Sequence, residues 1–141
     1  MGSERKRIAL CGAADDIKDI LEQGGNYQIS RFEDGHPESG FVKLAYFLQS
    51  GGTVPDLILI DYKGAAGLAA CDFLYDRQNA PPILWLCDRK EFEPEAERMG
   101  VSFLHTGPPP YQEKDTILKA IGDLLAKASA SEEYRRSEVV Q

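Results

Sequence analysis

The sequence has few cysteines and histidines, and they are not spaced as metal ligands. The three cysteines are Cys11, Cys71 and Cys87, and the two histidines are His36 and His105. None of these spacings is typical of a zinc site, and an odd number of scattered cysteines does not suit a disulfide framework. The sequence therefore predicts free thiols in a reducing compartment, and we expect a cytoplasmic protein.

Long apolar runs and an excess of basic residues are missing too. No apolar stretch approaches the roughly 20 residues that span a bilayer, and the start, MGSERKRIALCG, has too short an apolar segment for a secretory signal. The formal net charge is −7, whereas nucleic-acid surfaces concentrate Lys and Arg. We interpret the basic residues Arg5–Arg7 as a solvated approach to a first strand. We therefore expect no membrane partner and no direct nucleic-acid binding.

The sequence does contain a regular alternation of short apolar runs and helical patterns. Strand-like runs occur at Arg7–Cys11, Tyr27–Phe32, Asp56–Ile60, Pro82–Cys87 and Val101–His105. Apolar residues at helical spacing predict helices over Asp15–Gln23, Phe41–Leu48, Gly67–Gln78, Phe92–Met99 and Thr116–Ala128. Strands that are apolar on both sides need cover on both faces. The pattern therefore predicts a flavodoxin-like α/β fold, a three-layer α/β/α sandwich around a five-stranded parallel sheet.

The length of 141 residues suits a single domain with one core. We expect this domain to occupy residues 1–128. Residues 129–141, SASEEYRRSEVVQ, are polar and have no apolar period. We interpret them as a linker or disordered end in preference to a frayed continuation of the last helix.

One aspartate stands directly after the most apolar of these runs. Asp61 follows LILI, and in parallel sheets ligand chemistry lies at the carboxyl ends of the strands. Cys11 and Cys87 fall near the ends of two other strands and could face the same pocket. A buried free cysteine is more often a small apolar side chain than a reactive group.

The order of these elements, and the motif PDLILID (Pro55–Asp61) ahead of a glycine-rich loop, resemble the CheY-like receiver domain of two-component response regulators. The resemblance covers Arg7 to about Lys127. RIALCGAADDIKDIL is in register with the family's first strand and helix, PPILWLCD with its fourth strand, and MGVSFLHTGPP with its fifth strand and following turn. The resemblance implies that Asp61 is the candidate phosphoacceptor.

The acidic residues that bind Mg²⁺ in the family are not matched here. They correspond to Gly12 and Ala13. Asp15 and Asp16 come slightly later, at the start of a helix, where they are suited to stabilising its N-terminus. Since Mg²⁺ prefers carboxylate oxygens, we expect no metal and no other cofactor. A weaker alternative is Mg²⁺ held by Asp15, Asp16 and Asp61, needed only if Asp61 is phosphorylated.

Two further family positions differ. The family's Ser or Thr at the end of the fourth strand corresponds to Cys87, which is a poor hydrogen-bond donor. The family's lysine after the fifth strand has no counterpart in His105-Thr106-Gly107-Pro108. Together with Gly12 and Ala13, Cys87 and Thr106 are then candidates for lining the pocket beside Asp61. These departures indicate a non-enzymatic pseudo-receiver, with a conventional phosphorylatable receiver as the alternative.

The resemblance also implies protein partners: a histidine kinase, an output domain or another signalling protein. In receivers the fourth helix, fifth strand and fifth helix bind partners or a second copy, and these correspond to Phe92–Met99, Val101–His105 and Thr116–Lys127. Beside them, TGPPPYQ contains a rigid proline run. We expect Pro108, Pro109 and Tyr111 to be contact candidates, or the prolines simply to fix the turn.

Two alternatives come from other classes of protein. Cys11 ends the first strand ahead of small residues and a helix, where a thiolate can be a nucleophile. This is similar to the phosphocysteine loop of sugar-phosphotransferase B subunits and to the site of low-molecular-weight tyrosine phosphatases. However, CGAADDIK supplies carboxylates that repel phosphate, which makes phosphocysteine-type transfer the less favoured function. A nucleotide-binding domain is disfavoured because neither G-x-G-x-x-G nor a Walker loop is present.

Overall fold

The structure is a computed structural model of the whole chain. It describes residues 6–11, 15–25, 27–32, 44, 51, 54–61, 64–75, 81–107 and 112–139. The predicted helix over Phe41–Leu48 lies outside the described residues except for Leu44, which is helical and fully buried. Within the described residues, no helix combines the length and the apolar character needed to cross a membrane.

The predicted five-stranded parallel sheet is confirmed. Its strands are β1 (Lys6–Cys11), β2 (Tyr27–Phe32), β3 (Leu57–Ile60), β4 (Ile83–Cys87) and β5 (Ser102–His105). All pairings are parallel, and the spatial order is β2-β1-β3-β4-β5. This is the flavodoxin-like order, in which the chain reverses direction across the sheet between β1 and β3.

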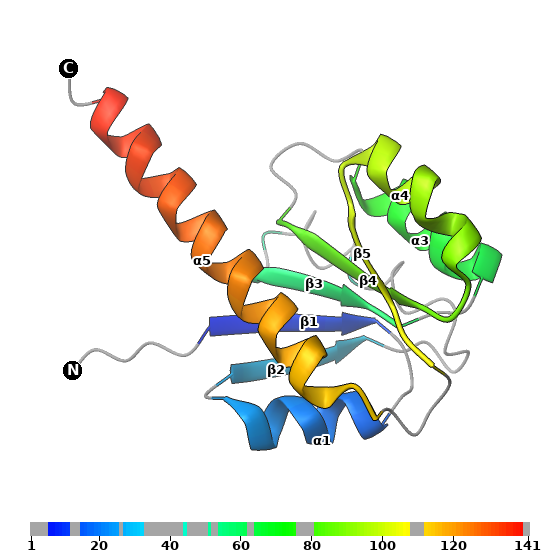
Figure 1. Cartoon of the computed structure of the whole chain (residues 1–141). Coiled ribbons are helices and arrows are strands. Elements are labelled where there is room, and N and C mark those ends of the chain that lie inside the picture. Colours follow the sequence, from blue (N-terminus) through cyan, green and yellow to red (C-terminus); the bar gives the residue numbers. More distant parts are fainter. Residues whose placement is uncertain are drawn as a thin grey trace.

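Helices cover both faces of this sheet, as Figure 1 shows. One face carries α1 (Asp15–Gly24) and α5 (Lys114–Val139), and the other carries α3 (Gly64–Tyr75) and α4 (Glu93–Met99). A short 3₁₀ turn, η2 (Lys90–Phe92), leads into α4. Three layers therefore form, and the predicted α/β/α sandwich is confirmed.

The central strands are buried on both sides because each faces two cores. Every residue of β3 and β4 is buried. Ile58, Ile60 and Trp85 belong to the core beneath α3 and α4, whereas Leu57 and Leu59 belong to the core beneath α1 and α5. The alternation follows from the two-residue period of a strand. It explains why these runs are apolar throughout.

Most predicted element boundaries agree with the structure to within about three residues, as expected for helix ends. The clear exception is α5, which continues to Val139. Residues 129–139 are therefore helical, which agrees with the alternative of a continued last helix and not with a disordered end; a role as a linker stays a prediction. It contains no Gly or Pro, and Ala, Glu and Arg are good helix formers. The helix projects past the sheet in Figure 1, so it needs no apolar stripe there. The domain boundary at residue 128 stays a prediction.

Candidate functional site

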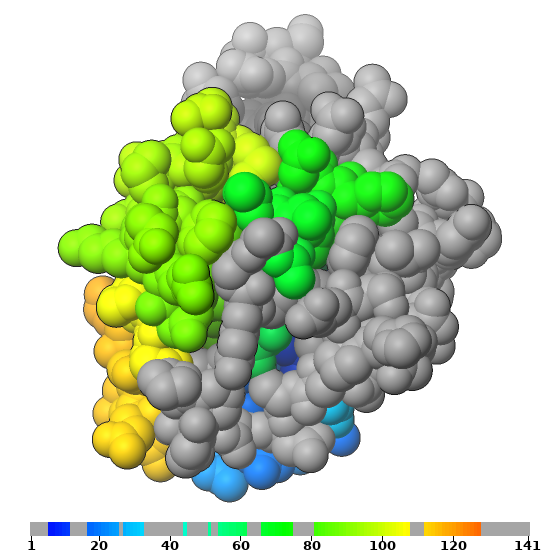
Figure 2. Space-filling model, turned by 90° about the vertical axis from the view of Figure 1, so that its right-hand side faces the viewer, coloured from blue at the N-terminus to red at the C-terminus, as the bar shows by residue number. Residues whose placement is uncertain are grey.

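The carboxyl ends of the strands form one edge of the sheet, and Figure 2 views the molecule from that side, with the green α3 and α4 above the yellow β5. Asp61 is the first residue after β3. Its backbone N–H donates to the carbonyl oxygen of Cys11 at 3.0 Å. This bond fixes the aspartate at the centre of the edge. Asp61 is half-buried there.

The ends of β4 and β5 are joined in the same way. The backbone N–H of Thr106 donates to the carbonyl oxygen of Cys87 at 2.9 Å. Thr106 is only 3% exposed. Among the described residues it is the one polar residue that is buried. Because the sheet order is β1-β3-β4-β5, Asp61 lies between the strand that ends at Cys11 and the strand that ends at Cys87.

The thiol of Cys87 is engaged by the turn that follows β4. The backbone N–H of Arg89 lies 3.4 Å from its Sγ, and Sγ lies 3.5 Å from the carbonyl oxygen of Arg89. The same turn is held from β5, because His105 Nε2 lies 3.2 Å from the carbonyl oxygen of Asp88. Cys87, the predicted counterpart of the receivers' Ser or Thr, is thus a buried thiol that makes weak local hydrogen bonds.

Glu113, which sequence reasoning did not single out, connects β5 to α5. Its Oε1 accepts the backbone N–H of Gly107 at 3.1 Å. Its carbonyl oxygen accepts the N–H of Ile117 at 2.9 Å, the first bond of α5. Glu113 is therefore the N-cap of α5 and anchors the start of the loop after β5. The helical pattern in the sequence begins only at Thr116, and glutamate is not among the usual N-cap residues, so no sequence signal singled out Glu113.

The three cysteines lie in one core and are all free thiols. Burial raises the pKa of the Cys11 thiol to about 12. Burial, and then the proximity of Cys11 and Cys87, raise the pKa of the Cys71 thiol to about 12. Cys11 is 0% exposed, so its thiol stays protonated at neutral pH. These observations oppose the hypothesis that Cys11 is a nucleophile for phosphotransfer, since the thiolate is the reactive form.

Several predicted site residues lie outside the described part of the chain. These are Gly12, Ala13, Pro108, Pro109, Tyr111 and the side chains of Asp15 and Asp16. In the described part, no three His, Cys, Asp or Glu side chains come together as a possible metal site. The residues described here therefore do not constitute a Mg²⁺ site. The pocket-lining and metal-binding roles of the predicted residues stay predictions.

Comparisons with known proteins agree on the fold. No protein-family model matches the sequence, and a search of curated proteins finds no match. Among solved structures, the response regulatory domain of protein mrkE from Klebsiella pneumoniae is similar at a TM-score of 0.62 and 17% identity, over 91% of this chain and 98% of that one.

Two further solved structures give the same result. The phosphorylated cyanobacterial phytochrome response regulator RcpA matches at a TM-score of 0.64 and 16% identity, over 87% of this chain and 95% of that one. A response regulator receiver protein from Burkholderia phymatum matches at 0.60 and 15%, over 86% and 96%. The chain therefore has the fold of the response regulator receiver domains.

Proposed function

We propose that this chain is a receiver-like signalling module of a two-component or related regulatory system, and that it acts through protein–protein interaction as a pseudo-receiver. The similarity of fold to receiver domains supports the general role. The side chains described at the carboxyl edge of the sheet support the more specific role of a pseudo-receiver. Where receivers carry a hydroxyl at the end of β4, this chain carries the Cys87 thiol, occupied by the turn at Arg89.

The second supporting observation concerns charge. Transfer of a phosphoryl group to an aspartate depends on positioning and on neutralising negative charge. Receiver domains carry a lysine directly after β5. In this chain the corresponding segment is His105, the buried Thr106 and Gly107. The backbone N–H of Gly107 donates to the carboxylate of Glu113. An acidic side chain therefore lies in this segment and no ammonium does, which disfavours a stable phosphoaspartate at Asp61.

On this proposal the module has no enzymatic activity of its own and requires no cofactor. Its partners are signalling proteins, such as a histidine kinase or an output domain, and a second copy of the chain could bind through the α4–β5–α5 face. This face includes an edge strand, because in the described part of the chain β5 pairs with β4 alone. The cytoplasm is the compartment in which we place it.

A conventional, phosphorylatable receiver is the second candidate. One observation favours it: Asp61 is half-buried at the middle of the carboxyl edge, where a donor could reach its carboxylate. In that case Mg²⁺ would be needed together with the phosphate, and Asp61 would supply one carboxylate ligand.

Intact-mass measurement after incubation with acetyl phosphate and Mg²⁺ separates the two candidates. The wild type, Asp61→Asn and the control Asp88→Asn are compared, since Asp88 is an exposed aspartate at the end of the neighbouring strand. We expect no phosphate adduct on any of them. An adduct on the wild type and on Asp88→Asn, but not on Asp61→Asn, would establish the conventional receiver and refute the pseudo-receiver.

A further inference from the structure

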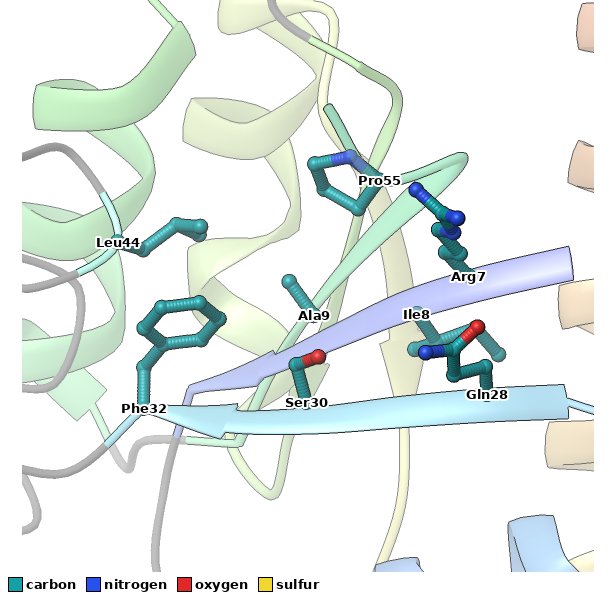
Figure 3. Close-up of a pocket in the computed structure, with 8 residues that line it drawn as sticks. All are labelled: Arg7, Ile8, Ala9, Gln28, Ser30, Phe32, Leu44 and Pro55. Carbon is teal, nitrogen blue, oxygen red and sulfur yellow. The ribbon is translucent and has the colours of Figure 1, made fainter. Parts of the chain in front are cut away.

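A pocket of about 210 Å³ lies over β1 and β2, on the face of the sheet that α3 and α4 cover (Figure 3). Its lining residues come from both strands, from the residue before β3 and from Leu44; they are Arg7, Ile8, Ala9, Gln28, Ser30, Phe32, Leu44 and Pro55. Asp61, Cys87 and Thr106 are not among them. The pocket is therefore separate from the candidate site at the carboxyl edge.

The strand register explains why the sheet is hollow here. Ala9 pairs directly with Ser30, and both side chains are short. Alternation places Arg7 on the same side of β1 as Ala9, and Arg7 pairs with Gln28 at the amino end. At the other end Phe32, the last residue of β2, closes the floor beside Leu44, as Figure 3 shows. The short side chains of Ala9 and Ser30 thus lie between longer side chains on both sides, and this leaves the hollow.

The pocket changes from polar to apolar along its length. Arg7, Gln28 and Ser30 are exposed polar residues, whereas Phe32 and Leu44 are packed with the core. The guanidinium of Arg7, a cation, extends beside Pro55 (Figure 3). Its backbone N–H donates to Asp56 Oδ2 at 2.8 Å. Within the described residues the guanidinium itself has no ion-pair partner.

The volume limits the size of a ligand. About 210 Å³ corresponds to about seven water molecules at roughly 30 Å³ each. Pockets that take drug-sized ligands are larger, about 300–1,000 Å³. A small organic acid with a ring or a short chain fits this space.

We propose that this pocket binds a small amphipathic carboxylate, whose acid group pairs with Arg7 and whose apolar body lies against Phe32 and Leu44. Gln28 and Ser30 supply hydrogen-bonding groups at the polar end and along the floor. The chain is strongly acidic overall, with a net charge of −7, so a local cation is required to hold an anion. This binding site does not depend on the proposed signalling function and would give the module an input other than phosphate.

The proposal is tested with hydrocinnamate and two probes that share its body, hydrocinnamyl alcohol and phenylpropylamine. Each is titrated into the full chain while backbone amide shifts are followed by NMR. We expect saturable binding of hydrocinnamate, with the largest shifts in β1 and β2. The alcohol and the amine should bind about tenfold or more weakly, because only the acid forms a charge-assisted hydrogen bond with Arg7.

Three variants locate the site. Ser30→Leu fills the floor from an exposed position of β2 and should abolish binding. Arg7→Gln should weaken hydrocinnamate about tenfold, to the level of the alcohol. The matched control Arg98→Gln, which removes an arginine that is 72% exposed on α4, should leave binding unchanged.

Four results would overturn the proposal: no binding of hydrocinnamate up to its solubility limit, equal binding of the acid and the alcohol, undiminished binding by Ser30→Leu, or shifts centred away from β1 and β2. The thermal unfolding of each variant is measured alongside. If Ser30→Leu is unfolded, the comparison of Arg7→Gln with Arg98→Gln and the charge series still decide the outcome.

Discussion

The backbone N–H of Asp61 donates to the carbonyl oxygen of Cys11 at 3.0 Å, so the candidate phosphoacceptor is held through its main chain. The bond extends the pairing of β1 with β3 by one residue. Chemical changes to the carboxylate should therefore leave the position of residue 61 intact. This separates tests of function from tests of folding at this residue.

Two substitutions at Asp61 should affect stability to different extents. Asp61→Asn keeps the N–H and should change the free energy of unfolding by less than about 1 kcal/mol, as at other partly exposed polar positions. Asp61→Pro removes the donor to Cys11, which is 0% exposed. We expect it to cost about 1–3 kcal/mol, because a buried carbonyl loses its partner. Urea denaturation followed by circular dichroism measures both, and equal stability of the two variants would contradict the inference.

Glu113 should matter more through its carboxylate oxygen than through its charge. Its side-chain Oε1 accepts the N–H of Gly107 at 3.1 Å, whereas the first bond of α5 is made by its backbone carbonyl. Glu113→Gln keeps an acceptor oxygen and should lose less than about 0.5 kcal/mol, whereas Glu113→Ala should lose about 0.5–1.5 kcal/mol, the usual net worth of one hydrogen bond. Urea denaturation compares the two with wild type.

Amide exchange at Gly107 provides a second readout for these variants. The N–H of Gly107 should exchange faster in Glu113→Ala than in Glu113→Gln, because only the alanine variant lacks an acceptor. The outcome against this assignment would be the same loss of stability in both variants, since the effect would then come from charge.

The fold was largely predictable because β3 and β4 are buried on both faces. Their residues are therefore apolar throughout, which can be seen in the sequence. LILI and ILWLC are apolar at every position, which is typical of strands in a parallel sheet between two helix layers. The strand β5 was also predicted, although its residues are mostly half-buried. The apolar pattern of such segments is a physical consequence of their burial, so it can be identified directly in the sequence.

The candidate site was less predictable because its contacts are made by the main chain and across long sequence distances. Asp61 could be placed at the end of a strand, but its bond to Cys11 could not. The anchoring of Gly107 by Glu113 depends on loop geometry, which no apolar pattern encodes. The hollow beside Ala9 arises from its pairing with Ser30, and pairing register is absent from the sequence of either strand alone.

The polar end of α5 was misjudged for a related reason. Periodicity reports which face of a helix packs on the sheet, and this part of α5 projects beyond the sheet (Figure 1). Its polar sequence up to Val139 was therefore interpreted as non-helical, although its residues favour a helix.

The buried thiols should make the protein less stable in alkaline solution. The pKa values of Cys11 and Cys71 rise from 9.0 to about 12 in the folded chain. Below pH 9 both states keep their protons, and the folded state has its full stability. Above 9 the unfolded chain loses thiol protons first, which favours unfolding, so the free energy of unfolding should fall as the pH rises toward 12.

Urea denaturation at a series of pH values across this window measures the slope, with Cys11→Ala/Cys71→Ala as the comparison. The double variant lacks both thiols and should show a shallower fall, although it is less stable at neutral pH because two buried side chains become smaller. Native alkylation by iodoacetamide should be slow at neutral pH and should become fast only in urea. Rapid alkylation of Cys11 in the native protein would refute its burial as a protonated thiol and revive the nucleophile hypothesis.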